Sequence, residues 1–119
     1  MNKYIKPGEI LLRQIALRRA GNQCEMCRDT YMLDNHHLLP KSVYPQHRLN
    51  PKGTVILCRM KCHDLAENHP KEFLAAARLN DNLVDRMIWF DQNRCIGKHP
   101  AKVDYEKHYL ALQEYLTRM

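Results

Sequence analysis

Residues 24–40 read CEMCRDTYMLDNHHLLP, and residues 54–63 read TVILCRMKCH. Two short-spaced cysteine pairs, Cys24 with Cys27 and Cys58 with Cys62, therefore bracket a pair of adjacent histidines. Zinc takes four tetrahedral ligands and binds thiolates tightly, so two such pairs can complete its coordination shell in a small chain. We expect the four cysteines to hold one structural zinc ion, because a complete shell leaves no position for a substrate.

The segments beside the cysteines predict two strands. Residues 31–33 are expected to form a short strand that runs into the histidines, and the β-branched, apolar residues 54–57 are expected to form the returning strand. Between them, prolines and Gly53 predict an irregular loop.

Helices are expected on both sides of this segment. Residues 7–20 carry apolar side chains at i, i+4 spacing, with Pro7 suited to the first turn and Gly21 to a left-handed stop. Further helices are expected over residues 61–68, 71–79, 81–90 and 102–117, with a break at Pro100. The expected packing stripes are Leu83, Val84, Met87 and Ile88 in the third of these and Tyr105, Tyr109, Leu112 and Leu116 in the last.

The chain of 119 residues is therefore expected to be a single α+β domain. Its parts are an N-terminal helix over about 7–20, a core over about 22–69 and a helical extension over about 70–119. No apolar run reaches the length of a membrane span and no signal pattern opens the chain, so we expect an intracellular, cytoplasmic protein. Disulfides are then the weaker explanation for five cysteines, and Cys95, without a partner at ligand spacing, is expected to be a small buried or half-exposed thiol.

The positive charge is concentrated in the half that holds the cysteines. Residues 1–62 contain eleven Lys and Arg against four Asp and Glu, whereas residues 63–119 contain eight against nine. This asymmetry suits a polyanionic partner such as nucleic acid, although scattered cations are also typical of an ordinary solvated surface. The candidate contact residues are Arg13, Arg18, Arg19, Lys41, Arg48 and Lys52.

The two adjacent histidines, His36 and His37, can serve two different partners. Neighbouring side chains on an extended segment point to opposite sides, so one imidazole can bind a metal while the other accepts a proton. A second cysteine pair that ends in Cys62-His63 adds another possible metal ligand.

Together these segments resemble the motif of the HNH endonucleases, a ββα-metal family. The resemblance covers roughly residues 22–69 and implies that His36 and His63 bind a catalytic divalent metal, with His37 as the general base. It also implies hydrolysis of phosphodiester bonds in nucleic acid, with duplex DNA favoured, by a core similar to small phage or mobile-element nucleases. Two imidazoles with open water positions would accept Mg, Mn, Ni or Zn.

Three positions differ from the family's pattern. Gly53 stands where the family has an asparagine that braces the loop, and Asn50 is the candidate substitute. An additional residue lies between Cys58 and Cys62, and Glu67 replaces a further histidine. Glu67, Asn68 and His69 are therefore candidate auxiliary ligands.

The second hypothesis is a zinc-binding module that holds nucleic acid or another acidic partner without cutting it. The sequence indicates neither oligomeric state nor cleavage specificity.

Overall fold

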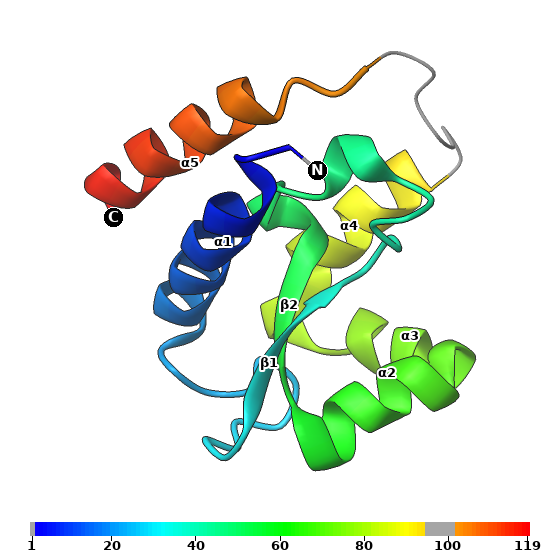
Figure 1. The fold of residues 1–119 in the computed structure, drawn as a ribbon. Helices are drawn as coiled ribbons and strands as arrows, with labels where there is room; N and C mark the ends of the chain where they lie inside the picture. Colours follow the sequence, from blue (N-terminus) through cyan, green and yellow to red (C-terminus); the bar gives the residue numbers. More distant parts are fainter. Residues whose placement is uncertain (1, 95–101) are drawn as a thin grey trace.

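The computed structural model describes residues 2–94 and 102–119, and these form a small α+β structure (Figure 1). Its longer elements are α1 (Ile5–Ala20), β1 (Leu33–His37), β2 (Thr54–Cys58), α2 (Asp64–Asn68), α3 (Pro70–Arg78), α4 (Val84–Asn93) and α5 (Tyr105–Arg118). The α+β class expected from the sequence is confirmed. The expectations for Cys95 and for a break at Pro100 lie outside the described residues. Within those residues, no helix is both long and apolar enough to cross a lipid bilayer.

The two strands form an antiparallel hairpin in which Leu33 pairs with Cys58 and His37 with Thr54. The first strand begins at Leu33 rather than Tyr31, which corrects the expected start. Met32 has a φ of 50°, in the left-handed region, so the chain turns there before it becomes extended. The strand consequently contains both histidines, whose side chains alternate between the two faces of the sheet.

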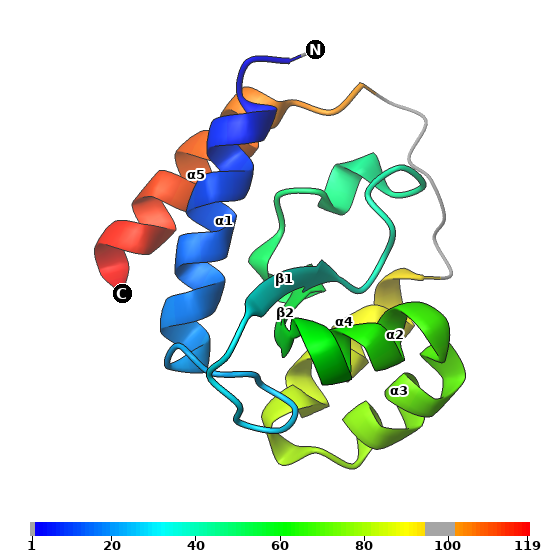
Figure 2. The same ribbon diagram turned by 60° about the horizontal axis from the view of Figure 1, so that its bottom comes forward.

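Helices cover both faces of this hairpin (Figures 1 and 2). On one face, Ile56 of β2 packs against Ala16 and Ala20 of α1. On the other, Val55 and Leu57 belong to a buried cluster with residues of α3 and α4, among them Phe73 and Met87. The strand β2 is buried along its whole length, which explains its nearly continuous apolar sequence.

The last helix, α5, packs against α1. Leu112 is buried with Leu12 and Ile15 of α1, and Tyr105 and Leu116 pack at the edge of the same cluster. The other residue of the expected stripe, Tyr109, lies beside Tyr4 with a ring-centroid distance of 5.7 Å. The amphipathic packing role expected for this helix is therefore confirmed.

The packing stripe expected on α4 is wrong in part. Leu83 and Met87 are buried, but Val84 and Ile88 are 45% and 53% exposed, and the buried face continues through Phe90 instead. A 3-10 turn over Asp81–Leu83 precedes the helix, and Leu83 at its end points into the core. Val84 and Ile88 each follow a buried residue by one position, so their side chains point toward solvent.

Candidate functional site

The four cysteines of the two pairs come together in one cluster. Their sulfur atoms all lie within 4.8 Å of one another, and the Sγ atoms of Cys27 and Cys58 are 3.6 Å apart. The hairpin brings the pairs together, because Cys58 ends β2 opposite the first residue of β1. Cys24, Cys58 and Cys62 are buried and Cys27 is partly exposed.

A π-helical turn over Arg59–His63 accommodates the longer second pair. This wider turn takes up the additional residue between Cys58 and Cys62, and the Cys62 amide donates to the Cys58 sulfur at 3.5 Å. Such turns are rare and occur often at functional sites. The additional residue therefore leaves both sulfurs in the cluster and leaves His63 facing the hairpin.

The chemistry of the cysteine cluster fits a metal ion such as zinc. Burial raises the pKa of the Cys58 and Cys62 thiols, and four neighbouring thiolates would repel one another strongly. A divalent cation bound by four sulfurs reduces both obstacles, because it displaces the thiol protons and offsets two of the four negative charges. The cluster could therefore hold one metal ion.

Glu25, inside the first cysteine pair, connects this cluster to the rest of the fold. Its buried carboxylate accepts from the Ile56 amide at 3.0 Å, from Arg19 at 3.2 Å and from buried Arg86. Arg19 also donates to the carbonyl oxygens of Pro51 and Thr54 at 2.7 and 2.8 Å. The expected role of Arg19 as a nucleic-acid contact is therefore corrected, since its guanidinium is engaged within the fold.

A second group of possible metal ligands lies where β1 faces α2. One ligand atom from each of His36, His63 and Glu67 can be chosen so that all lie within 4.8 Å of one another. Glu67 Oε1 is 3.1 Å from His63 Nε2 and 3.9 Å from His36 Nδ1, and the two imidazole centroids are 5.2 Å apart. Glu67 joins the group because it follows His63 by one helical turn.

The surroundings of His63 suit a positive charge at Nε2, whether a second ring proton or a metal cation. Its Nδ1 lies 2.9 Å from Asp34 Oδ2, and its Nε2 faces Glu67, so each ring nitrogen meets a carboxylate. Ionised carboxylates only accept hydrogen bonds, and a neutral imidazole has only one N–H. If Asp34 takes that hydrogen, a cation between Nε2 and Glu67 would satisfy the remaining lone pairs. Asp34 is itself held by Arg59, whose Nη2 lies 2.9 Å away.

His36 is suited to metal binding by its protonation state. Burial, reinforced by the nearby His63, lowers its pKa to about 4. The ring is therefore neutral near pH 7, which is the form that binds metals. Its packing against Phe73, with a centroid distance of 5.9 Å, accounts for part of that burial.

His37 points away from this group and has a different partner. Its Nε2 lies 2.8 Å from the main-chain carbonyl oxygen of Arg48. A carbonyl oxygen only accepts, so Nε2 carries the proton of the neutral ring and Nδ1 keeps a lone pair. Burial lowers the pKa of His37 as well, which keeps the ring neutral near pH 7. This is the tautomer that a proton acceptor at Nδ1 requires.

Both histidines open into one cleft of about 930 Å³ between α1 and the hairpin. Its lining includes His63 and Glu67 as well as the α1 cations Lys6 and Arg13. Neither of these two cations forms an ion pair within the described residues, although Arg13 donates to the Leu33 carbonyl oxygen at 3.1 Å. The cleft, which Glu9 also lines, therefore combines imidazoles, carboxylates and positive charge.

The remaining candidates have other positions. Asn50 does not line the cleft; its side chain accepts from the Lys52 amide at 3.0 Å and caps the turn Pro51–Gly53. Asn68 donates to Asp64 at 2.7 Å, and His69 is exposed outside the ligand group, so of the three auxiliary candidates only Glu67 joins His36 and His63.

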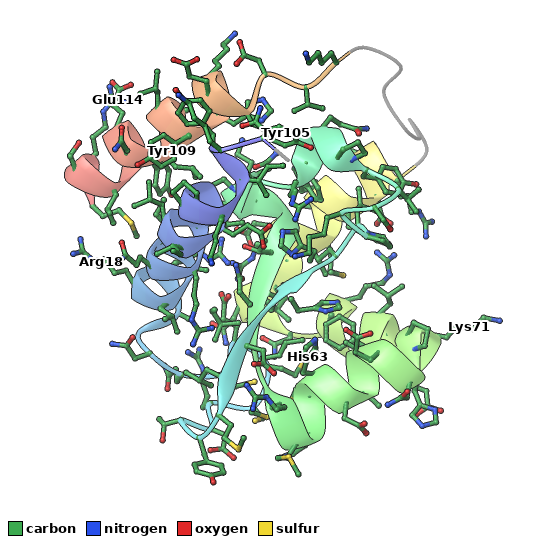
Figure 3. The ribbon with its side chains drawn as sticks, viewed as in Figure 1. Arg18, His63, Lys71, Tyr105, Tyr109 and Glu114 are labelled. Atoms are coloured by element: carbon green, nitrogen blue, oxygen red, sulfur yellow. The ribbon has the colours of Figure 1, made fainter. Side chains whose placement is uncertain are left out.

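Of the remaining cationic candidates, Lys41 and Arg48 line the cleft and are paired with Glu9, at 3.0 and 2.7 Å. Arg18 and Lys52 are exposed, and Arg18 points away from the body of the molecule (Figure 3). Sequence reasoning missed the anionic partners Glu9, Glu25 and Asp34.

No protein-family model, curated protein or solved structure matches this chain.

Proposed function

We propose that the chain is a metal-dependent endonuclease of the HNH, ββα-metal type, which hydrolyses phosphodiester bonds in nucleic acid, duplex DNA in particular. The observation that carries this proposal is the arrangement in the cleft. The possible ligands His36, His63 and Glu67 lie on one side of β1, and His37, with its Nδ1 unprotonated, faces the other side of the same cleft.

The order of the surrounding elements supports the same proposal. The hairpin β1–β2 is followed directly by the turn that carries His63 and by α2, which carries Glu67. The cysteine cluster lies at the end of the hairpin and would act as a structural zinc site, because four sulfur ligands leave no open position. One metal would then stabilise the hairpin while the other serves the reaction.

Each side chain has a defined task in this proposal. His37 Nδ1 takes the proton of the attacking water, and the Arg48 carbonyl oxygen keeps the ring oriented by accepting from Nε2. His36, His63 and Glu67 would hold the divalent cation, Mg, Mn, Ni or Zn, and Asp34 orients His63 through Nδ1. When bound, the cation would neutralise charge that develops on the phosphate and the leaving oxygen.

The charge of the cleft supports a polyanionic substrate. Lys6 and Arg13 line it without acidic partners within the described residues, and they belong to the strongly basic half of the chain. Phosphates neutralised by such side chains release condensed counterions, which gives affinity without sequence recognition. We therefore propose binding through the nucleic-acid backbone.

Plasmid nicking by the purified protein tests the proposal. Mg, Mn or Ni should support conversion of supercoiled to nicked DNA, EDTA should stop it, and His37→Ala should reduce it strongly. The alternative is a zinc-binding module without catalysis, and Gly53 at the family's asparagine position favours it. DNA binding without cleavage under any of the three metals would lead us to adopt that alternative.

A further inference from the structure

One carboxylate on α1 connects two distant points of the loop between the strands. Glu9 Oε2 accepts from Lys41 Nζ at 3.0 Å, and its Oε1 accepts from Arg48 Nε at 2.9 Å and lies 2.7 Å from Arg48 Nη2. Lys41 lies near the start of residues 38–53 and Arg48 near their end. Glu9 thus holds both limbs of the loop against α1.

The same loop holds the ring of His37. The main-chain oxygen of Arg48 accepts from His37 Nε2, while the Arg48 side chain is held by Glu9. Glu9 on α1 therefore contacts the side chain of Arg48, and the main-chain oxygen of Arg48 contacts the imidazole of His37. Salt-bridged hydrogen bonds of this kind are stronger than neutral ones, and Arg48 presents two nitrogens to the same oxygen, which fixes its direction.

Glu9 adds a side-chain contact to a loop that lacks the side-chain brace expected at residue 53. Gly53 has no side chain, and Asn50 is used in capping the turn Pro51–Gly53. We infer that Glu9 is a positioning residue for His37: it fixes Arg48, and thereby the tautomer and orientation of the imidazole. The catalytic consequence rests on the function proposed above, whereas the effect on the ring does not.

Nitrogen NMR of labelled histidine tests the effect on the ring directly. At a pH where the imidazole is neutral, wild-type His37 should show Nε2 protonated and Nδ1 unprotonated. In Glu9→Ala the Arg48 side chain loses its contact with α1, so the carbonyl oxygen should be held less firmly and the two tautomers should mix. Glu9→Gln keeps one acceptor oxygen and should have a smaller effect. Glu114→Gln, which removes an exposed carboxylate paired with Arg118 on α5, is the matched control and should leave the His37 signals unchanged (Figure 3).

Cleavage kinetics test the consequence. Glu9→Ala should lower kcat by roughly ten- to hundredfold, because a small displacement of a reacting group has an effect of this size. KM for DNA should stay the same or fall, since the substitution removes a negative charge from a basic cleft. A role limited to DNA binding would raise KM instead and would overturn the inference.

Folding must be checked separately from positioning. Zinc content and the circular dichroism spectrum should match wild type in each variant that is compared. If Glu9→Ala does not fold, Arg48→Lys provides the second test, because lysine keeps the charge but loses the two-nitrogen contact with Glu9. Wild-type His37 signals in a folded variant would overturn the inference even if cleavage were reduced. Mixed tautomers in a protein that cuts no DNA would uphold it while refuting the nuclease.

Discussion

Gly53 lies so close to Trp89 of α4 that a Cβ atom at residue 53 would be 2.7 Å from the indole Cη2. The space that a side chain would occupy is filled by this ring, which is itself buried. The Gly53 carbonyl oxygen accepts from the Leu38 amide at 2.9 Å, so the backbone cannot move away freely. An asparagine at this position would therefore displace Trp89.

This contact predicts that Gly53→Asn destabilises the fold. Overpacking a well-filled core costs about 1–3 kcal/mol, and the rigid indole cannot relieve the clash by a small rotation. The free energy of unfolding in urea should fall by that amount in Gly53→Asn and by less in Gly53→Ala. Lys52→Ala, at the exposed neighbouring residue, is the control. An increase in stability for Gly53→Asn would mean that the asparagine finds room and bonds at this position.

Local sequence patterns were sufficient to predict much of the framework. The spacing of the cysteine pairs identified the sulfur cluster, because it depends on two short turns and one hairpin. Gly21 marked the end of α1, where its φ of 66° is one that side chains disfavour. Tandem His36 and His37 also indicated that their side chains lie on opposite sides of the strand, since alternation follows from extended backbone alone.

Contacts between distant residues could not be predicted in the same way. Glu9 meets Lys41 and Arg48 only because α1 packs beside the loop, and no spacing in the sequence relates them. Arg19 belongs to a basic segment, which favours a nucleic-acid contact, yet the fold engages it with the carbonyl oxygens of Pro51 and Thr54. The π-helical turn at residues 59–63 could not be predicted either, because the sequence shows only that one additional residue lies between Cys58 and Cys62.

The cysteine cluster predicts the metal content of the protein. Cys58→Ser should lower zinc by about one ion per chain and destabilise the fold, because structural zinc contributes on the order of ten kcal/mol of apparent folding free energy in small domains. Cys95→Ser should leave the zinc content unchanged, since Cys95 belongs to neither pair. Atomic absorption on both variants checks this. Equal zinc in wild type and Cys58→Ser would rule out the cluster as the binding site.

The pairing of Glu9 predicts a pH-dependent contribution to stability. Burial alone would raise its pKa, but the bonds from Lys41 and Arg48 hold the pKa below its ordinary value of 4.5. A carboxyl with a lowered folded-state pKa adds stability above its unfolded-state value and loses it as the pH falls. The difference in unfolding free energy between wild type and Glu9→Gln should therefore shrink from about pH 6 to about pH 4.

The cations provide the control for this pH effect. In a protein that already carries Lys41→Ala and Arg48→Ala, the two cations that lower the pKa of Glu9 are gone. Adding Glu9→Gln to that protein should change the free energy of unfolding by an amount that no longer shrinks toward low pH. Urea titrations of the four proteins at each pH supply the measurement. A wild-type difference that grows as the pH falls would show that burial, and not the two cations, dominates the pKa of Glu9.

Lys6 and Arg13, which line the cleft and have no acidic partner among the described residues, predict how DNA affinity responds to salt. Each phosphate contact adds about 0.9 to the slope of log affinity against log salt concentration. Lys6→Ala should flatten the slope by about that amount, whereas Lys71→Ala, an exposed cation on α3, should leave it unchanged (Figure 3). Arg19→Ala should lower stability instead, because it removes bonds to Pro51, Thr54 and Glu25. Equal slopes for wild type and Lys6→Ala would remove this cleft from the DNA-binding surface.

The two adjacent histidines predict two different kinds of defect. His37→Ala should keep the affinity for DNA and for the divalent metal but reduce cleavage by roughly a hundred- to ten-thousandfold, the usual effect of losing a proton acceptor. More metal should not restore it, because a cation does not replace the acceptor at Nδ1. Calorimetric titration of metal into zinc-loaded protein and a nicking assay over a range of metal concentrations provide the two measurements.

His36→Ala should behave in the opposite way. It removes one of the three possible ligands that share the cation, so metal affinity should fall, and a higher metal concentration should restore part of the cleavage. His63→Ala should match it, since its Nε2 faces the same Glu67 oxygen. His69→Ala is the control, because that exposed histidine lies outside the ligand group and should leave metal affinity unchanged. Wild-type affinity in both His36→Ala and His63→Ala would show that neither is a ligand, and the proposed nuclease would lose its metal.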